Sequence, residues 1–191
     1  MADKRVERSR KAIESAYINL LQTKDNHCIT ISDIINAAGY SKTAFYNNFS
    51  CKEDLLMEIY RLLATELFET LKTSSFEAKK ASSLAPEEKQ KLTLRHFIAP
   101  YETVYRNKDY YSVLYSQFGI HAVESIMNIV LDMQTADLIF ANTVPEPLNA
   151  ALFGYSHLWD TMGCIAWWLR HDFEYSPDYM GKQQFMRLSS I

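Results

Sequence analysis

Apolar residues recur along most of the chain with the spacing that buries one face of an α-helix. The clearest case lies in residues 4–23, where the pattern i, i+3, i+4, i+7, i+8 is filled by Ile13, Ala16, Tyr17, Leu20 and Leu21. The same periodicity predicts helices at 52–72, 86–105, 109–118, 120–141, 148–171 and 177–189. Alternating strand patterns are scarce. With the two short helices described next, the sequence predicts an all-α fold of about nine helices.

Two short helices are predicted between the first long helix and the one that begins at residue 52. Thr30 followed by Asp33 is a capping-box pattern, and Gly39 stands where a left-handed residue ends a helix. Ser41 is then placed to cap a helix over about 42–48. Two helices joined by a glycine-containing turn are the arrangement of a helix-turn-helix motif.

The long helix that follows opens with a second capping-box pattern, formed by Ser50 and Glu53. Its apolar face is expected to end near residue 72. Residues 72–90 are rich in Ser, Lys and Glu, so we expect the frayed end of this helix and a connection there.

The short helix over 42–48 is too polar and too short to be stabilised by its own buried face. We expect Ala44, Phe45 and Phe49 to anchor it from behind. Lysine, threonine and asparagine suit contacts with phosphates and base edges, and helix N-termini such as those at Thr30 and Lys52 bind phosphate oxygens. The side chains expected on the outer, DNA-facing side are Lys42, Thr43, Tyr46, Asn47 and Asn48.

The net charge of −3 hides an asymmetry between the two parts of the chain. Residues 1–52 hold 8 Lys or Arg against 5 Asp or Glu, and the remaining residues hold 12 against 18. A basic N-terminal part on an acidic remainder indicates a polyanionic partner at the N-terminal end. An ordinary solvated helix start has the same charge pattern, so charge alone leaves both interpretations open.

Several classes of protein are disfavoured by composition and motifs. The three cysteines are widely spaced without a CxxC pair, which argues against a disulfide framework or a zinc site. No signal-peptide or membrane-spanning pattern is evident, so we expect a cytoplasmic protein without a membrane partner. No nucleotide-binding, metalloprotease or hydrolase motif occurs, and we expect no catalytic residue, cofactor or metal. Two pairs are expected to be hydrogen-bonding pairs rather than metal ligands: His121 with Glu124, and His157 with Asp160.

Residues 29–60, ITISDIINAAGYSKTAFYNNFSCKEDLLMEIY, resemble the DNA-binding signature of TetR (tetracycline repressor) family regulators. The positions that match the family pattern are Thr30, Ile34, Ala38, Gly39, Ser41, Phe45, Tyr46, Phe49, Lys52, Glu53 and Leu55. A looser resemblance to the dimerising region of one branch of the family covers residues 163–180. Departures from the pattern are Tyr40, Thr43 and the pair Asn47-Asn48, so an operator sequence cannot be borrowed from relatives.

The resemblance implies two domains and a set of DNA contacts. Residues 1–51 would form the helix-turn-helix DNA-binding domain and residues 52–191 the ligand-binding and dimerisation domain, with 52–72 as connector. Tyr46 and Lys52 would bind phosphates, assisted by Thr30 and Ser41, while Lys42, Thr43 and Asn47 would face the bases. We expect Asn47 to recognise an adenine. The alternatives are a half-buried packing role for Tyr46 and an ordinary solvated position for Lys52.

The C-terminal part is rich in aromatic residues, which the resemblance divides between a ligand cavity and a dimer interface. The residues expected to line the pocket are Tyr101, Tyr105, Tyr115, Trp159 and Met162. Those expected at the dimer interface are Phe153, Trp167 and Trp168, where Gly154 and Gly163 would permit close approach of helices. A place in the core remains the alternative for most of these rings. A mostly apolar pocket would suit a small hydrophobic or aromatic effector.

The sequence thus predicts a homodimeric transcriptional repressor that binds a palindromic double-stranded DNA operator and is released by a small-molecule effector. The effector would shift the population toward a dimer whose DNA-binding domains no longer match the half-sites. An activator of the same fold has the same sequence features. A helical ligand- or partner-binding module without DNA binding and a helical enzyme are the rival classes.

Overall fold

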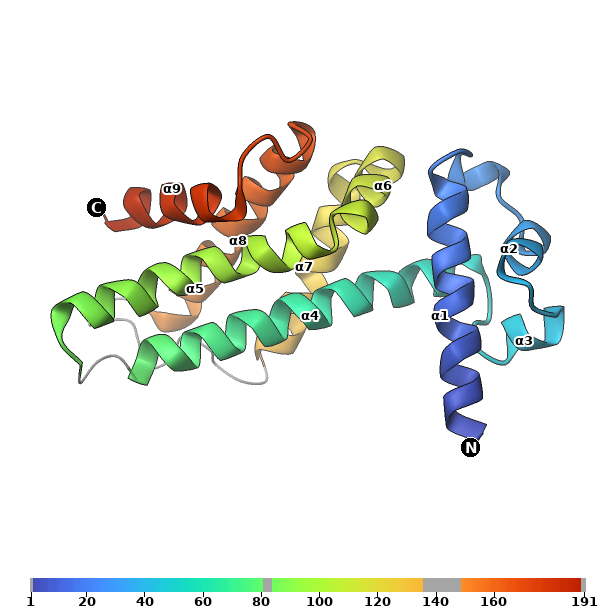
Figure 1. The fold of residues 1–191 in the computed structure, drawn as a ribbon, viewed down its shortest axis with the longest axis horizontal. Coiled ribbons are helices and arrows are strands. Elements are labelled where there is room, and N and C mark those ends of the chain that lie inside the picture. Colours follow the sequence, from blue (N-terminus) through green and yellow to red (C-terminus); the bar gives the residue numbers. More distant parts are fainter. Residues whose placement is uncertain (1, 81–83, 136–148, 190–191) are drawn as a thin grey trace.

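The computed structural model describes residues 2–80, 84–135 and 149–189, which hold nine α-helices, one 3₁₀ turn and no strand (Figure 1). The all-α prediction is therefore confirmed for these residues. The elements, in chain order, are α1 (Ala2–Leu21), η1 (Asn26–Cys28), α2 (Ile31–Ala38), α3 (Lys42–Tyr46), α4 (Lys52–Lys80), α5 (Pro86–Arg106), α6 (Lys108–Phe118), α7 (Ile120–Thr135), α8 (Ala150–Arg170) and α9 (Pro177–Ser189).

The first three helices gather at one end of the molecule and form what we call the head, residues 2–51 (Figure 1). Helix α1 packs against both α2 and α3. The core of the head consists of fully buried side chains from the three helices, Ile13, Tyr17, Leu21, Ile34 and Phe45, together with Phe49, which follows α3. The helix-turn-helix is thus built on the apolar face that the sequence predicted for the first helix.

The predicted signals at the ends of the short helices are present. Thr30 Oγ1 accepts from the backbone N–H of Asp33 at 3.2 Å, and the Asp33 carboxylate accepts from the backbone N–H of Thr30 at 2.9 Å. The bonds that the carboxylate accepts from the Thr30 backbone N–H and hydroxyl lower the pKa of Asp33. Gly39 ends α2 with φ 69°, and Ser41 Oγ accepts from the N–H of Ala44. The turn between α2 and α3 therefore has the geometry that its sequence requires.

Helix α4 leaves the head and runs along the rest of the molecule, the body, residues 52–189 (Figure 1). Helices α5 and α7 pack on α4, α9 packs on α5, and α8 packs on α7. Helix α9 approaches α5 closely at Gly181, where an added Cβ would lie 2.6 Å from the Cα of Ile98. The core of the body lies between these helices.

Helix α4 extends to Lys80, eight residues beyond the expected end near 72, so that boundary was wrong. Two serines of this last part, Ser74 and Ser75, are buried, and helix α5 supplies a hydrogen-bond partner for Ser74. Ser74 Oγ donates to the carbonyl of Leu71, and it lies 2.9 Å from Nδ1 of His96 on α5. A polar sequence was therefore compatible with a buried helix.

Helix α1 ends at Leu21, two residues before its expected end, and α8 begins at Ala150 rather than at 148. Asn149 caps α8, because its Oδ1 accepts from the N–H of Leu152 at 3.0 Å. Part of the predicted helix 120–141 and the start of 148–171 lie outside the described residues. Within the described residues, no helix combines the length and apolarity needed to cross a bilayer.

Candidate nucleic-acid interface

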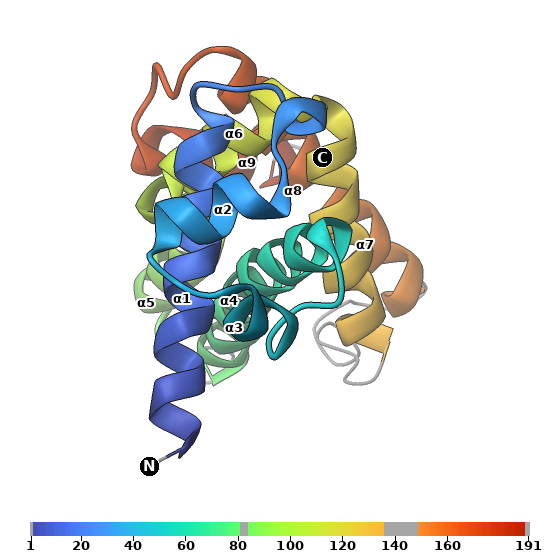
Figure 2. The same ribbon diagram turned by 90° about the vertical axis from the view of Figure 1, so that its right-hand side faces the viewer.

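Helix α3 is anchored by two aromatic side chains and presents a polar surface. Phe45 and Phe49 are buried, with ring centroids 5.7 Å apart, and the guanidinium of Arg10 lies over the Phe49 ring. Tyr46 is 50% exposed. Lys42, Thr43 and Asn47 are exposed as well. Figure 2 views the molecule from this end, where the three helices of the head lie nearest the viewer.

Asn48 does not face outward, and that expectation was wrong. Its Nδ2 donates to the carbonyl of Ala44 at 2.7 Å and to Oγ of the buried Ser9 at 3.2 Å. The side chain therefore ties the end of α3 to α1. The spacing of residues on α3 could not show this contact, because Ser9 is 39 residues away in sequence.

A groove of about 640 Å³ separates the N-terminal part of α1 from α3. Arg5 and Val6 line one side, while Thr43 and Asn47 line the other. Lys4, Arg5 and Arg8 are exposed along this part of α1. The exposed face of α3 is thus continuous with a basic helix end, which favours an anionic partner.

Thr30 and Ser41 are exposed but already serve as helix caps. The Thr30 hydroxyl also lies 2.7 Å from the Asp33 carboxylate, to which it donates. Each hydroxyl lies beside a helix N-terminus, where free N–H groups are available to an oxygen of a ligand.

Lys52 holds the turn between α1 and α2. Its Nζ donates to the carbonyl oxygens of Asn26 at 2.7 Å and Ile29 at 2.9 Å. An ammonium group carries three hydrogens, so one remains for a further acceptor. The sequence did not indicate this structural role, because both carbonyls lie more than twenty residues away in irregular backbone.

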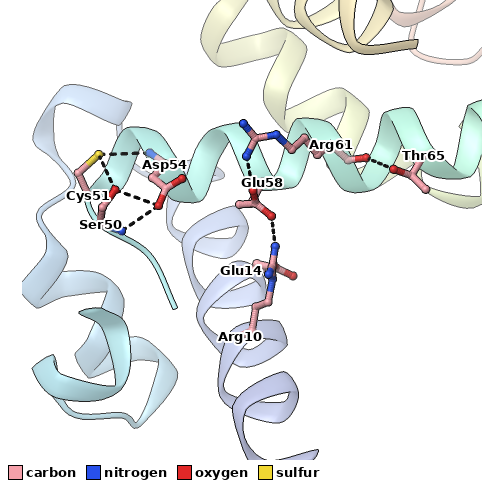
Figure 3. Close-up of polar contacts among 8 residues, drawn as sticks. All are labelled: Arg10, Glu14, Ser50, Cys51, Asp54, Glu58, Arg61 and Thr65. Carbon is pink, nitrogen blue, oxygen red and sulfur yellow. Dashed lines mark hydrogen bonds and ion pairs between the residues drawn. The ribbon is translucent and has the colours of Figure 1, made fainter. Parts of the chain in front are cut away.

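Charged residues join α1 to α4 (Figure 3). Arg10 bonds Glu14 on its own helix and Glu58 on α4, and Glu58 also bonds Arg61. Burial raises the pKa of the Glu14 carboxyl, while Arg10 opposes that shift. The ion pair between Arg10 and Glu58 thus connects α1 to α4 at the point where α4 leaves the head.

The start of α4 differs from the predicted capping box in one residue. Asp54, rather than Glu53, accepts from the backbone N–H of Ser50 at 2.8 Å and from its hydroxyl at 3.0 Å (Figure 3). These bonds lower the pKa of the Asp54 carboxyl. Cys51 lies next to the first helical residue, and its Sγ accepts weakly from the N–H of Asp54.

The residues expected to line a ligand pocket are spread over the body. Tyr101 and Met162 are fully buried in the core, and the Tyr101 hydroxyl donates to Oε1 of the buried Gln184. Tyr105 and Trp159 are exposed. Tyr115 is partly buried and accepts from Arg170 at 3.2 Å. Trp159 lines a cavity of about 410 Å³ whose walls include none of the other four side chains.

Of the residues expected at a dimer interface, Phe153 and Trp167 are 42% and 45% exposed. Trp168 is fully buried, and its indole N–H donates to the carbonyl of Tyr175. The expectation that Trp168 faces a partner was therefore wrong. Phe153 lies at the edge of a stripe that four other exposed apolar side chains of α8 form on one side of the helix: Leu152, Tyr155, Trp159 and Trp167.

The histidine pairs differ in their surroundings. His121 Nδ1 lies 2.9 Å from the Glu124 carboxylate on the exposed surface, which is the pairing that the sequence predicted. His157 is buried and stacks on His96. Burial is the main cause that lowers the pKa of His157, and it lowers the pKa of His96 to about 3.

A helix-turn-helix unit whose second helix displays polar side chains, joined to a larger helical body, is an arrangement found in helix-turn-helix transcriptional regulators. Residues 15–59 match the family model of bacterial regulatory proteins of the tetR family. An uncharacterized HTH-type transcriptional regulator of Bacillus subtilis (strain 168), YxbF, is 34% identical over 65 residues. That match covers 34% of this chain but only 17% of the relative.

Solved structures share the fold over nearly the whole chain. A TetR transcriptional regulator from Streptococcus agalactiae 2603V superposes with a TM-score of 0.61 at 18% identity, covering 97% of this chain and 96% of that one. The dihydroxyacetone kinase operon activator DhaS gives a TM-score of 0.58 at 16% identity, covering 95% and 94%. Residues 15–59 are therefore similar in sequence to bacterial regulatory proteins of the tetR family, and the fold of the chain is similar to that of these two solved structures.

Proposed function

We propose that the protein binds a double-stranded DNA operator through α3 and represses transcription as a homodimer. The observation that carries this proposal is the short helix α3, anchored by buried Phe45 and Phe49 and exposed along the face that bears Lys42, Thr43 and Asn47. A helix held in this way can enter a major groove without losing its own packing.

The proposed contacts follow from the placement of each side chain. Lys42, Thr43 and Asn47 face the bases, and Tyr46 contacts the phosphate backbone with its exposed hydroxyl end. Thr30 and Ser41 assist at the helix N-termini. Lys52 contacts a phosphate through the hydrogen that its two carbonyl acceptors leave available. Residues 1–51 serve as the DNA-binding domain, and residues 52–191 as the ligand-binding and dimerisation domain.

The exposed stripe of α8 is the proposed dimer interface. Large aromatic side chains gathered on one helix face are unusual on the surface of a monomer. Gly163 lies on the same face, and nothing lies within 4 Å of the position of a Cβ there, which leaves space for a second helix. A two-fold dimer presents two copies of α3, so the operator would be palindromic.

A small-molecule effector that binds the body and releases the protein from its operator completes the proposal, and its support is the fold shared with TetR-family regulators. The rings of the body suit a small hydrophobic or aromatic molecule. Since Tyr101 and Met162 are packed in the core, such a molecule would have to separate helices to reach them. That separation is the step that would release DNA.

Transcriptional activation is the second candidate, because the fold is also that of a protein named as an operon activator, DhaS. DNA binding would be the same in both cases. A reporter driven by the native promoter distinguishes them: deletion of the gene raises expression for a repressor and lowers it for an activator.

The decisive experiment is fluorescence anisotropy with duplexes from the native upstream region. We expect specific binding that weakens steeply as salt rises, because phosphate contacts release counterions. Tyr46→Phe provides a matched variant, since it removes only the hydroxyl and keeps the ring. Failure of the wild-type protein to bind any palindromic duplex from its own locus, even at low salt, would overturn the proposal.

A further inference from the structure

The turn between α1 and α2 is held by polar side chains from three helices. Asn26, the first residue of η1 within this turn, receives one hydrogen bond on its side-chain oxygen from the Tyr17 hydroxyl at 2.7 Å. Its carbonyl receives another from Lys52, and its backbone N–H donates to Oε1 of Gln117 at 3.0 Å. Tyr17 belongs to α1, Lys52 to α4 and Gln117 to α6. This turn is therefore a junction of the head with the body.

Gln117 uses both ends of its amide at this junction. While Oε1 accepts from Asn26, Nε2 donates to the carbonyls of Leu21 at 2.8 Å and Lys24 at 3.3 Å. Leu21 is the last residue of α1, and the last carbonyls of a helix have no partner within it. Helix α1 also has no basic residue in its last turn. Gln117 therefore caps α1 from a helix more than ninety residues further along the chain.

The chemistry of this contact requires a donor and an acceptor in one side chain. A glutamine amide supplies two N–H donors and one carbonyl acceptor, which is what the two carbonyls and the one N–H need. Glutamate has the same shape but no donor when ionised, and it would place a negative charge against the negative end of α1. Methionine has a similar length without strong hydrogen bonding.

We infer that Gln117 is a positioning residue that fixes the turn at Asn26, and with it the head, relative to the body. Its consequence for operator binding rests on the proposed function. Lys52, the proposed phosphate contact, donates to the carbonyl of Asn26, and the N–H of Asn26 donates to Gln117. Two consecutive hydrogen bonds through Asn26 therefore join Gln117 on α6 to the residue proposed to contact phosphate. Loss of the Gln117 contacts would leave the head joined to the body through α4 and its bonds from Lys52 and Glu58, and would weaken binding to a duplex that requires a fixed orientation.

Amide hydrogen exchange of the full-length protein tests the contact without DNA. In Gln117→Glu and in the uncharged Gln117→Met, we expect the Asn26 N–H to exchange about fivefold faster or more, the factor that corresponds to one hydrogen bond of ordinary strength. Gln90→Glu makes the same charge change at an exposed position of α5 and should leave that rate unchanged. Circular dichroism identifies a variant that fails to fold. An unchanged Asn26 rate in a folded Gln117→Met protein overturns the inference.

Operator affinity then tests whether the Gln117 contacts hold the head in the orientation that operator binding requires. We expect both Gln117 variants to bind the native operator about fivefold more weakly, with unchanged affinity for a scrambled duplex, because only the specific complex needs a fixed head. Faster exchange with unchanged operator affinity would show that the contact holds the turn but does not position the head, and would overturn that part. If the wild-type protein bound no operator, the proposed function would fail, while the exchange rates would still decide the role of Gln117.

Discussion

The head and the body are both helical, but different information specifies them. In the head, short helices are bounded by capping side chains, and Thr30, Gly39 and Ser41 take the conformations that their positions in sequence predict. In the body, apolar periodicity predicts the long helices, but tertiary packing decides which side chains each aromatic ring contacts. Local rules therefore determine the surface that we propose meets DNA, and packing over long distances determines the part that would respond to an effector.

The largest expected effects come from truncating one core ring in each region. Phe45→Ala and Trp168→Ala each remove a fully buried aromatic side chain, so we expect each to lower the free energy of unfolding by about 3–5 kcal/mol. Urea denaturation monitored by circular dichroism measures the free energy of unfolding of each variant. If head and body form one cooperative unit, both variants shift a single transition. A separate early transition in Phe45→Ala alone would show that the head unfolds independently.

The body should be the more sensitive region to mild acid. His96 is buried with its pKa lowered to about 3, so it stays neutral in the folded protein while the unfolded chain takes up a proton below about pH 6.5. Stability is therefore lost as pH falls from about 6.5 toward 3, with a loss of about 2 kcal/mol by pH 5. Thermal denaturation at pH 7 and pH 5 should show a smaller difference for His96→Gln than for wild type. The exposed His121→Gln serves as control and should retain the wild-type difference.

The caps of the head should contribute less than its core. Thr30→Ala removes the side-chain acceptor of the α2 capping box, and we expect a loss of about 1 kcal/mol in unfolding free energy. Thr30→Ser keeps the acceptor and is the matched control. A stability of Thr30→Ala equal to that of Thr30→Ser would show that the capping bond contributes nothing measurable.

Asn47→Ala should change stability least, by less than about 0.5 kcal/mol, because its side chain is exposed on α3. Its effect should be on sequence preference. Selection of binding sites from random duplexes should yield a motif that loses one adenine relative to wild type. Identical motifs from the two proteins would exclude Asn47 as a base-reading residue.

The sequence predicted the helical fold and most side-chain positions on α3, because caps and periodicity act over three or four residues. It did not reveal the contacts of Asn48 with Ser9 or of Lys52 with Asn26, since these join segments that meet only after folding. The wrong prediction for Trp168 has a different cause, which lies in helix geometry. Neighbouring positions on a helix lie about 100° apart, so Trp167 and Trp168 could not both face the same partner helix.

Helix α4 links the two regions without interruption over 29 residues. At about 1.5 Å per residue its length is about 43 Å, which exceeds the spacing of about 34 Å between half-sites one turn apart on DNA. A rotation of α4 by about 5° at its far end would shift the other end by about 4 Å, more than the length of a hydrogen bond. Under the proposed function, an angular change of a few degrees in α4 is thus large enough to move α3 out of register with a base pair.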